Sequence, residues 1–414
     1  MKYNTVRGMR DLLPEQAKKK QYIIEVCKKV FEKYGFEPME TPIVEELGLL
    51  SKKGGAGEEI RNEVYYFKDK SGRELGLRFD LTVPLARVIA SNPQLPKPFK
   101  RYQIGNVYRY DRPQAGRYRE FAQADADIIG TASMLAEFEC IAIALEIMQA
   151  LGIKGVIKIN NRKLLEEIAT RNGVKKSQIA ECLRAIDKLE KIGARQVEKE
   201  LKQKGIKTQI LGQLGEQKLE RAIECDGKKE LSEIFALLKE NRLLEFVKLN
   251  LALARGLDYY TGTVFEIASN SLALGAGGRY NRLIELYGGK ATPAVGISFG
   301  IDRLMDATGE IPEKEKEIVF ISPVGKTKKD ALALATKIRK EGIACEMDLL
   351  ERGISKNLEY ASKKKIRFAM ILGEEELKQN SVTVRDMRTG KQNAIKLDEI
   401  VKELKRLLEK PGNR

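Results

Sequence analysis

Histidine and tryptophan are both absent from the 414 residues of this chain. The lack of histidine excludes Ser-His-Asp triads, HExxH zinc sites, histidine general bases and phosphohistidine carriers. The five cysteines lie far apart and form no CxxC pair, which argues against a cysteine-rich zinc site or a disulfide framework and fits a reducing compartment. Any catalysis must therefore use arginine, lysine, carboxylates, tyrosine or bound metal ions.

Long apolar segments and a secretory signal are also missing. The most apolar stretch, 141–151, is interrupted by Glu146 and Gln149 and is shorter than the roughly 18 residues that cross a bilayer. The first eleven residues are polar and contain no apolar h-region. We therefore expect a soluble, cytoplasmic protein without a membrane partner.

Positive charge is in excess. The chain has 75 lysines and arginines against 59 acidic residues, a formal net charge of +16. Such a balance favours a polyanionic partner, although basic proteins that bind no nucleic acid also exist. Because 43% of the residues are hydrophobic, the chain can bury real cores, and its length suggests about two to three domains.

The spacing of apolar residues changes along the chain. It predicts a long helix from Pro14 to Gly35, followed by strands that alternate with turns and suggest an antiparallel sheet. The predicted strands span 64–67, 74–79, 99–110 and 118–129. From Lys163 to about Lys248 helical spacing and dense charge predict a helical insertion, after which the sheet resumes near Leu249 and includes a strand at 294–299. A βαβαβ series then follows a short linker at 309–317 and predicts a separate α/β domain.

The segment 96–119 holds seven basic residues and five interleaved aromatic residues. A solvated charged hairpin is the ordinary interpretation of a charge run. Arginine forks match phosphate oxygens and aromatic rings can stack on bases, so polyphosphate or RNA binding is the favoured interpretation here. The sequence LGAGGRY at 274–280 lacks the spacing of a phosphate-binding loop, and its glycines are expected in tight turns or close packing.

Taken in order, several segments resemble the motifs of the histidyl-tRNA synthetase family of class II aminoacyl-tRNA synthetases, in an archaeal-like form. The resemblance covers essentially the whole chain, and the ordered set is far more specific than any one motif. TPIVE at 41–45 resembles motif 1, YRYDRPQAGRYREF at 108–121 motif 2, and GISFGIDRL at 296–304 motif 3. The histidine-specific signatures correspond to RGLDYYTGTVF at 255–265 and to 275–280.

This resemblance implies an α/β protein with a class II antiparallel catalytic sheet, a helical insertion and a C-terminal mixed α/β anticodon-binding domain. The implied boundaries are 1–160 and 249–312 for the catalytic domain, 161–248 for the insertion and 317–414 for the anticodon-binding domain. It also implies a homodimer that uses ATP, Mg²⁺, histidine and histidine tRNA. No protein ligands for a metal are assigned.

The same resemblance implies a reaction that needs no histidine base, because the substrate carboxylate itself attacks the α-phosphate of ATP. Arg109 and Arg255 would be the catalytic residues on either side of that phosphate. Arg109 would also bind ATP together with Arg117 at the terminal phosphates and with Phe121 and Arg303 around adenine.

Further residues are assigned by the resemblance to histidine and to tRNA. The α-amino group would be bound by Asp80, Thr82 and Gln123, and the imidazole by Asp127, Tyr259 and Tyr260. Arg112 and Gln114, in the motif 2 loop, would read the acceptor end of the tRNA. Asp80 and Asp127 stand where bacterial relatives often carry glutamate, and Ala122 replaces a bulkier residue. The resemblance therefore does not fix how far each carboxylate extends toward the substrate.

Three other interpretations stay open. The family includes a non-catalytic paralogue, the regulatory subunit of ATP phosphoribosyltransferase, which usually lacks the anticodon domain and degrades the two signatures. Another class II synthetase, for threonine, proline or glycine, is opposed by the segment 255–265. A pure RNA-binding module is allowed by the net charge alone.

Overall fold

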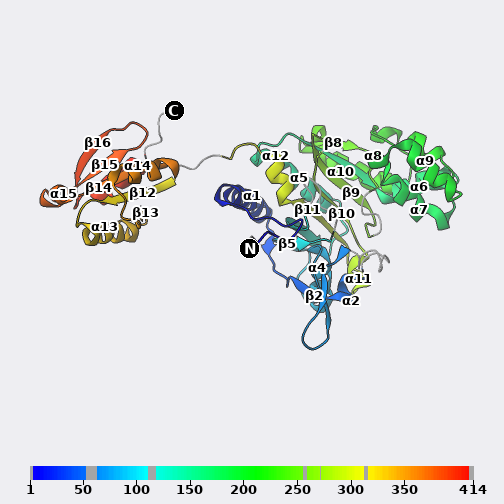
Figure 1. The fold of residues 1–414 in the computed structure, drawn as a ribbon. Helices are drawn as coiled ribbons and strands as arrows, with labels where there is room; N and C mark the ends of the chain where they lie inside the picture. Colours follow the sequence, from blue (N-terminus) through cyan, green and yellow to red (C-terminus); the bar gives the residue numbers. More distant parts are fainter. Residues whose placement is uncertain are drawn as a thin grey trace. The chain divides into compact units, whose positions relative to one another are not determined.

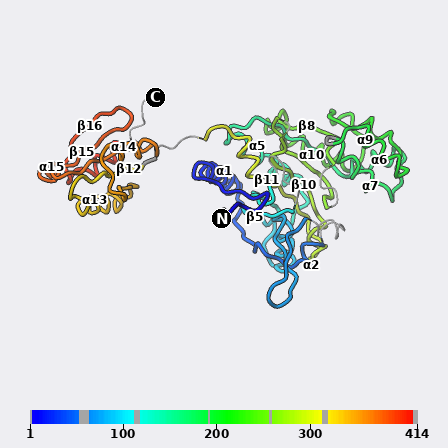
Figure 2. Tube along the Cα trace, in the orientation of Figure 1, coloured from blue at the N-terminus to red at the C-terminus, as the bar shows by residue number. Residues whose placement is uncertain are grey.

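The computed structural model describes residues 3–52, 63–110, 118–254, 259–270, 272–311 and 316–409. The chain forms two compact units that divide between Ile311 and Pro312, and each is described by itself (Figures 1 and 2). Among the described residues, no helix is long and apolar enough to cross a membrane.

The first unit is built on an eight-stranded sheet with the order β1-β5-β6-β11-β10-β9-β7-β8. The strands are β1 (Glu37–Pro38), β5 (Phe99–Tyr108), β6 (Glu120–Ile129), β7 (Val156–Asn161), β8 (Val247–Leu249), β9 (Thr263–Ser269), β10 (Leu272–Arg279) and β11 (Ala294–Gly300). Only the β1–β5 and β7–β8 pairs are parallel, and all other neighbours are antiparallel. The predicted antiparallel sheet is therefore confirmed.

A smaller sheet and several helices complete this unit. The small sheet has the order β2-β4-β3, with β2 (Val44–Glu46), β3 (Tyr66–Lys68) and β4 (Glu74–Leu77). The helices are α1 (Pro14–Lys33), α2 (Leu47–Leu50), α4 (Thr82–Ser91), α5 (Leu135–Ala150), α6 (Arg162–Arg171), α7 (Ile179–Ile186), α8 (Leu189–Ile192), α9 (Ala194–Gln203), α10 (Asp226–Glu240), α11 (Leu283–Leu286) and α12 (Ile301–Ala307). Helices α6 to α9 lie together at one side of the unit (Figure 1), and the predicted helical character of 163–248 is confirmed.

The two faces of the large sheet differ in polarity. Side chains alternate between faces along a strand, so Ala122, Ala124 and Ala126 of β6 share one face and Gln123, Asp125 and Asp127 share the other. The alanines belong to a hydrophobic core with residues of α1 and α5. The helices therefore cover the apolar face, and the polar face is left for chemistry.

Glycines of β10 allow the backbone of β11 and the side chain of Phe265 to lie close to the β10 backbone. A Cβ on Gly277 would lie less than 3.0 Å from the carbonyl oxygen of Gly296 and 2.7 Å from Cζ of Phe265. The expectation of close packing at 274–280 is confirmed, but the tight turn is wrong, because most of this segment is strand.

The second unit is a mixed sheet with the order β13-β12-β14-β15-β16. Its strands are β12 (Lys316–Pro323), β13 (Ala344–Met347), β14 (Ile366–Leu372), β15 (Ser381–Asp386) and β16 (Gln392–Lys396), and its helices are α13 (Lys328–Lys340), α14 (Ile354–Lys363), α15 (Glu374–Lys378) and α16 (Ile400–Glu409). The first three strands are parallel and the last two pairings antiparallel. This arrangement confirms the βαβαβ prediction, and β15 and β16 extend the sheet beyond that series.

Candidate active site

On the polar face of the large sheet, polar side chains are concentrated where the neighbouring strands β5, β6 and β11 lie. The register places Gln123 and Asp125 of β6 opposite Gly300 and Ser298 of β11. The Gln123 side-chain amide donates a hydrogen bond of 2.8 Å to the Ser298 hydroxyl. Burial raises the pKa of Asp125 to about 7, although Arg101 opposes that shift. This face therefore presents acceptors and carboxylates in a desolvated setting.

Asp127 lies at the centre of a buried polar cluster. Its Oδ2 atom is 2.7 Å from Nη2 of Arg101, the residue directly opposite on β5. Its Oδ1 atom accepts a hydrogen bond from the Tyr280 hydroxyl. Burial raises the pKa of Asp127, while Arg101 and the Tyr280 hydrogen bond oppose that rise. A carboxylate held this way can accept a further N–H from a ligand.

Three tyrosine rings form a wall beside Asp127. The ring centroids of Tyr259 and Tyr260 are 4.2 Å apart, and those of Tyr259 and Tyr280 are 6.2 Å apart. Burial raises the pKa of all three phenols, so they stay protonated and can donate hydrogen bonds at neutral pH. Such a wall combines apolar ring faces with polar tips, which suits a small aromatic ring that carries nitrogen atoms.

Asp80 and Thr82 lie at the start of α4. Asp80 is 5% exposed, and its Oδ1 atom accepts a 3.0 Å hydrogen bond from the backbone N–H of Val83. This contact fixes the carboxylate at the first turn of the helix. Burial is the largest cause of the raised pKa of Asp127, and the negative charge of Asp80 adds to it. The two carboxylates are therefore close enough to interact electrostatically.

Arg109 and Phe121 adjoin this cluster. The Arg109 guanidinium carbon is 5.1 Å from the centroid of the Phe121 ring, and its Nε donates a 3.0 Å hydrogen bond to the carbonyl oxygen of Phe79. Arg303 of α12 donates from Nη1 to the carbonyl oxygen of Ala273 at 2.5 Å. The structure thus brings Arg109 and Phe121 together beside Phe79, the residue before Asp80, while Arg303 is held against β10.

Four predicted site residues, Arg112, Gln114, Arg117 and Arg255, lie outside the described residues. Their roles stay predictions.

Among the described residues of the basic segment 96–119, Arg101 departs from the prediction. The prediction makes the basic residues of this segment available to phosphate or RNA, but the Arg101 side chain is fully buried. That interpretation is wrong for Arg101, because a strand that alternates between faces can direct a cation into the interior as easily as toward solvent. Aromatic residues of the segment also contact arginines of the chain itself, as Tyr118 does with Arg10 at 3.8 Å.

Sequence reasoning missed several residues of the cluster. Asp125 was not assigned to a site, Ser298 and Tyr280 were noted only as parts of a motif and a signature, and Arg101 was placed only in the basic segment. A signal was present for Asp125, since the alternation in QADAD at 123–127 places it on the same face as Gln123 and Asp127.

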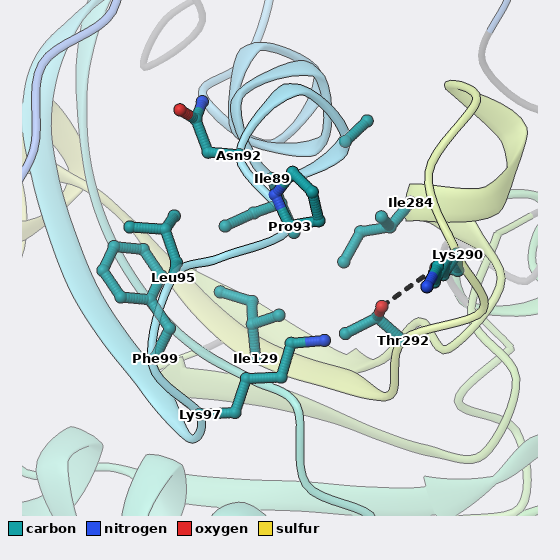
Figure 3. Close-up of a pocket in the computed structure, with 11 residues that line it drawn as sticks. Ile89, Asn92, Pro93, Leu95, Lys97, Phe99, Ile129, Ile284, Lys290 and Thr292 are labelled. Atoms are coloured by element: carbon teal, nitrogen blue, oxygen red, sulfur yellow. Dashed lines mark hydrogen bonds between the residues drawn. The ribbon is translucent and has the colours of Figure 1, made fainter.

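A separate cavity of about 160 Å³ lies at the ends of β5, β6 and α4 (Figure 3). Its apolar lining includes Ile89, Phe99 and Ile129, and Lys97 and Lys290 also line it. None of the predicted site residues that the structure describes lines it. We assign the candidate active site to the polar cluster because the cluster, unlike this cavity, holds buried carboxylates and a buried arginine.

No group of three or more His, Cys, Asp or Glu side chains is arranged to hold a metal ion in the part of the chain that the structure describes.

Comparison with known proteins identifies both units. The family described as "Histidyl-tRNA synthetase" matches residues 8–304, and "Anticodon binding domain" matches residues 318–407. The histidine–tRNA ligase of Pyrococcus furiosus is 38% identical, over 97% of this chain and 99% of its own length. That of Methanocaldococcus jannaschii is 37% identical, over 95% and 97%.

Solved structures agree with these matches. The histidyl-tRNA synthetase of a Nostoc species superposes with a TM-score of 0.81 and 28% identity, covering 98% of this chain and all of its own. A Bacillus halodurans protein described as an ATP phosphoribosyltransferase regulatory subunit/histidyl-tRNA synthetase shares the fold, with a TM-score of 0.74, 23% identity and coverage of 90% and 98%. By its sequence, its two units and the match along nearly its whole length, the chain belongs to the histidyl-tRNA synthetase family.

Proposed function

We propose that this chain is a histidine–tRNA ligase. It activates histidine with ATP to histidyl-adenylate and pyrophosphate, and then transfers histidine to the 3′ end of histidine tRNA. The observation that carries the proposal is that one chain holds both the synthetase family match and the anticodon-binding match. A regulatory paralogue would not need the second unit.

Histidine is proposed to bind on the polar face of the large sheet. Asp127, Tyr259 and Tyr260 would surround the imidazole, and Asp80, Thr82 and Gln123 the α-amino group. Support comes from the burial of Asp127 and from its contacts with Arg101 and Tyr280. A ring that lacks nitrogen would leave these polar groups without partners, which disfavours it strongly.

Adenylate formation requires positioning and charge stabilisation rather than a protein base. A carboxylate oxygen of histidine forms a bond to the α-phosphorus of ATP as the bond to pyrophosphate breaks. Arg109 and Arg255 would stabilise the charge on that phosphate. Arg117 would bind the terminal phosphates, and Phe121 and Arg303 would enclose adenine. The position of Arg109 near Phe121 and Asp80 supports its place between ATP and histidine.

In the second step, the terminal ribose hydroxyl of the tRNA attacks the carbonyl of the adenylate and AMP leaves. Arg112 and Gln114 are proposed to contact the acceptor end. Mg²⁺ is proposed to accompany ATP and to neutralise phosphate charge. Mg²⁺ beside a nucleotide is usually held by one or two carboxylates together with phosphate oxygens, and no step is assigned to the ion here.

The remaining proposals concern organisation. We propose a catalytic domain at 1–160 and 249–312, a helical insertion at 161–248 and an anticodon-binding domain at 317–414, in a homodimer located in the cytoplasm. Exposed apolar side chains on and next to the small sheet support dimer formation. Val44, Tyr66 and Phe67 of the sheet and Ile43, just before β2, are each at least 39% exposed.

Histidine-dependent exchange of pyrophosphate into ATP tests the proposal. We expect exchange with histidine and none with threonine, proline or glycine, followed by charging of histidine tRNA. A regulatory subunit of ATP phosphoribosyltransferase would show no exchange with any amino acid but would change the activity of that transferase. A pure RNA-binding module would do neither.

A further inference from the structure

Arg101 is a fully buried cation on the polar face of the large sheet. Its Nη2 atom lies 2.7 Å from Oδ2 of Asp127 and 3.3 Å from the carbonyl oxygen of Leu81, to which it donates. Its Nε and Nη1 atoms have no hydrogen-bond partner among the described residues. A buried guanidinium with two nitrogen atoms that donate no hydrogen bond lowers the stability of the fold. We therefore expect its charge to stabilise a neighbouring group.

Asp127 is the neighbour that gains most from this charge. Its Oδ1 atom accepts from Tyr280, whereas Oδ2 is in ion-pair contact with Arg101 but accepts no aligned hydrogen bond from the described residues. Oδ2 is therefore the acceptor left for a ligand. The opposing residue on β11 is Gly296, which leaves the space that this carboxylate occupies.

The groups around Asp127 would otherwise favour its neutral form. Asp80 ahead of α4 adds negative charge, the pKa of Asp125 on the same strand is itself raised to about 7, and Tyr260, Tyr280 and Cys140 of α5 are neutral at pH 7. Burial and Asp80 raise the pKa of Asp127, and Arg101 is the first opposing influence. Without that cation, only the Tyr280 hydrogen bond would oppose the effects of burial and of Asp80 on Asp127.

We propose that Arg101 is a positioning residue for histidine recognition: it keeps the buried Asp127 a carboxylate, with Oδ2 directed to accept a ring N–H of the substrate. This inference rests on the proposed function and extends it to a residue that does not touch the substrate. A charge-assisted hydrogen bond is roughly twice as strong as a neutral one. A protonated Asp127 would therefore bind histidine more weakly.

The experiment compares the KM for histidine, between pH 6.5 and pH 9, in the full-length parent and in Arg101→Met. Removal of the cation raises the pKa of Asp127, so the variant holds a neutral carboxyl at low pH and regains the carboxylate as the pH rises. We expect its KM to exceed the parental KM by about tenfold at pH 7 and the ratio to fall severalfold by pH 9, since one pKa unit corresponds to a factor of ten. The KM for ATP should stay within about twofold.

Arg279→Met is the matched control. Arg279 forms an equally buried ion pair with Glu137, with side chains 3% and 0% exposed, but toward α5 on the apolar side of the sheet. This variant should lose stability, and its KM ratio to the parent should not change with pH. The inference is overturned if Arg101→Met retains the parental KM, or if its KM ratio is as independent of pH as that of the control.

Arg101→Lys and a proton count provide a second route if Arg101→Met does not fold. Lysine keeps the charge, so we expect a smaller rise in KM without pH dependence; a rise that depends on pH would contradict the charge argument. For a folded variant, calorimetry of histidine binding in two buffers should show release of more protons than in the parent, and an equal count would contradict it. A parent without histidine-dependent exchange would instead overturn the proposed function.

Discussion

Substitution of Gly296 by alanine tests the geometry of the histidine pocket with a single methyl group. An alanine Cβ at this position would lie less than 3.0 Å from Oδ1 of Asp127 and 2.7 Å from its Cγ. The backbone of Gly296 is ordinary strand, so the obstacles are steric: this overlap and a 3.1 Å approach to the carbonyl oxygen of Ala126. Asp127 must move, and it cannot then keep its contacts with both Tyr280 and Arg101.

Two magnitudes follow from that displacement. Overpacking of this kind lowers the free energy of unfolding by about 1–3 kcal/mol. Loss of a hydrogen bond to a charged group costs about 1.5–3 kcal/mol, which corresponds to a KM for histidine raised about 10- to 100-fold. We expect the KM for ATP to change little, because Gly296 lies opposite Asp127 and away from Arg109.

The assay is pyrophosphate exchange with histidine and ATP varied separately, together with urea unfolding. Gly277→Ala is the control, because its Cβ would meet Phe265 at 2.7 Å on the apolar face. It should destabilise the protein without a selective effect on histidine. A parental KM for histidine in Gly296→Ala, or an equal rise in both KM values, would refute the placement of histidine at Asp127.

Three further predictions concern residues elsewhere in the chain. Arg255→Ala should slow adenylate formation by on the order of 10² with little change in histidine binding, as measured by pre-steady-state kinetics; a near-normal rate would contradict its role at the α-phosphate. Arg112→Ala and Gln114→Ala should slow transfer to tRNA far more than activation, whereas equal losses would place these side chains on ATP. Iodoacetamide at pH 8 should modify the partly exposed Cys225 well before Cys27, whose pKa burial raises to about 12; peptide mass spectrometry showing equal rates would indicate that α1 opens readily.

The elements that the sequence predicted are those with a clear period or composition. Helix α1 carries buried side chains at helical spacing. Strand β5 was recognised from its tyrosine and valine content and only loose alternation, and β6 as the strand that resumes after a turn. Strand β10 was not predicted, because its glycines suggest turns when neighbouring residues alone are considered. A side chain at Gly277 would overlap Phe265 and Gly296, which belong to the neighbouring strands and approach Gly277 only in the folded protein.

The candidate site was only partly predictable for a related reason. The family resemblance supplied Gln123 and Asp127, and the structure places both on the polar face of β6. Arg101 was misplaced because a run of basic residues does not reveal which of them point inward. The partnership of Arg101, Asp127 and Tyr280 joins three separate segments of the chain, and it becomes visible only when the strand register is known.

The two-faced sheet restricts how this enzyme family can change. One residue inserted or deleted at the start of β6 would turn Gln123, Asp125 and Asp127 toward the helices and bring the alanines between them to the polar face. Under the proposed binding of histidine on that face, the length of this strand is constrained as firmly as the identity of its residues. New amino-acid specificity must arise by exchange of side chains in place, while length variation is confined to turns and to segments away from the strand register.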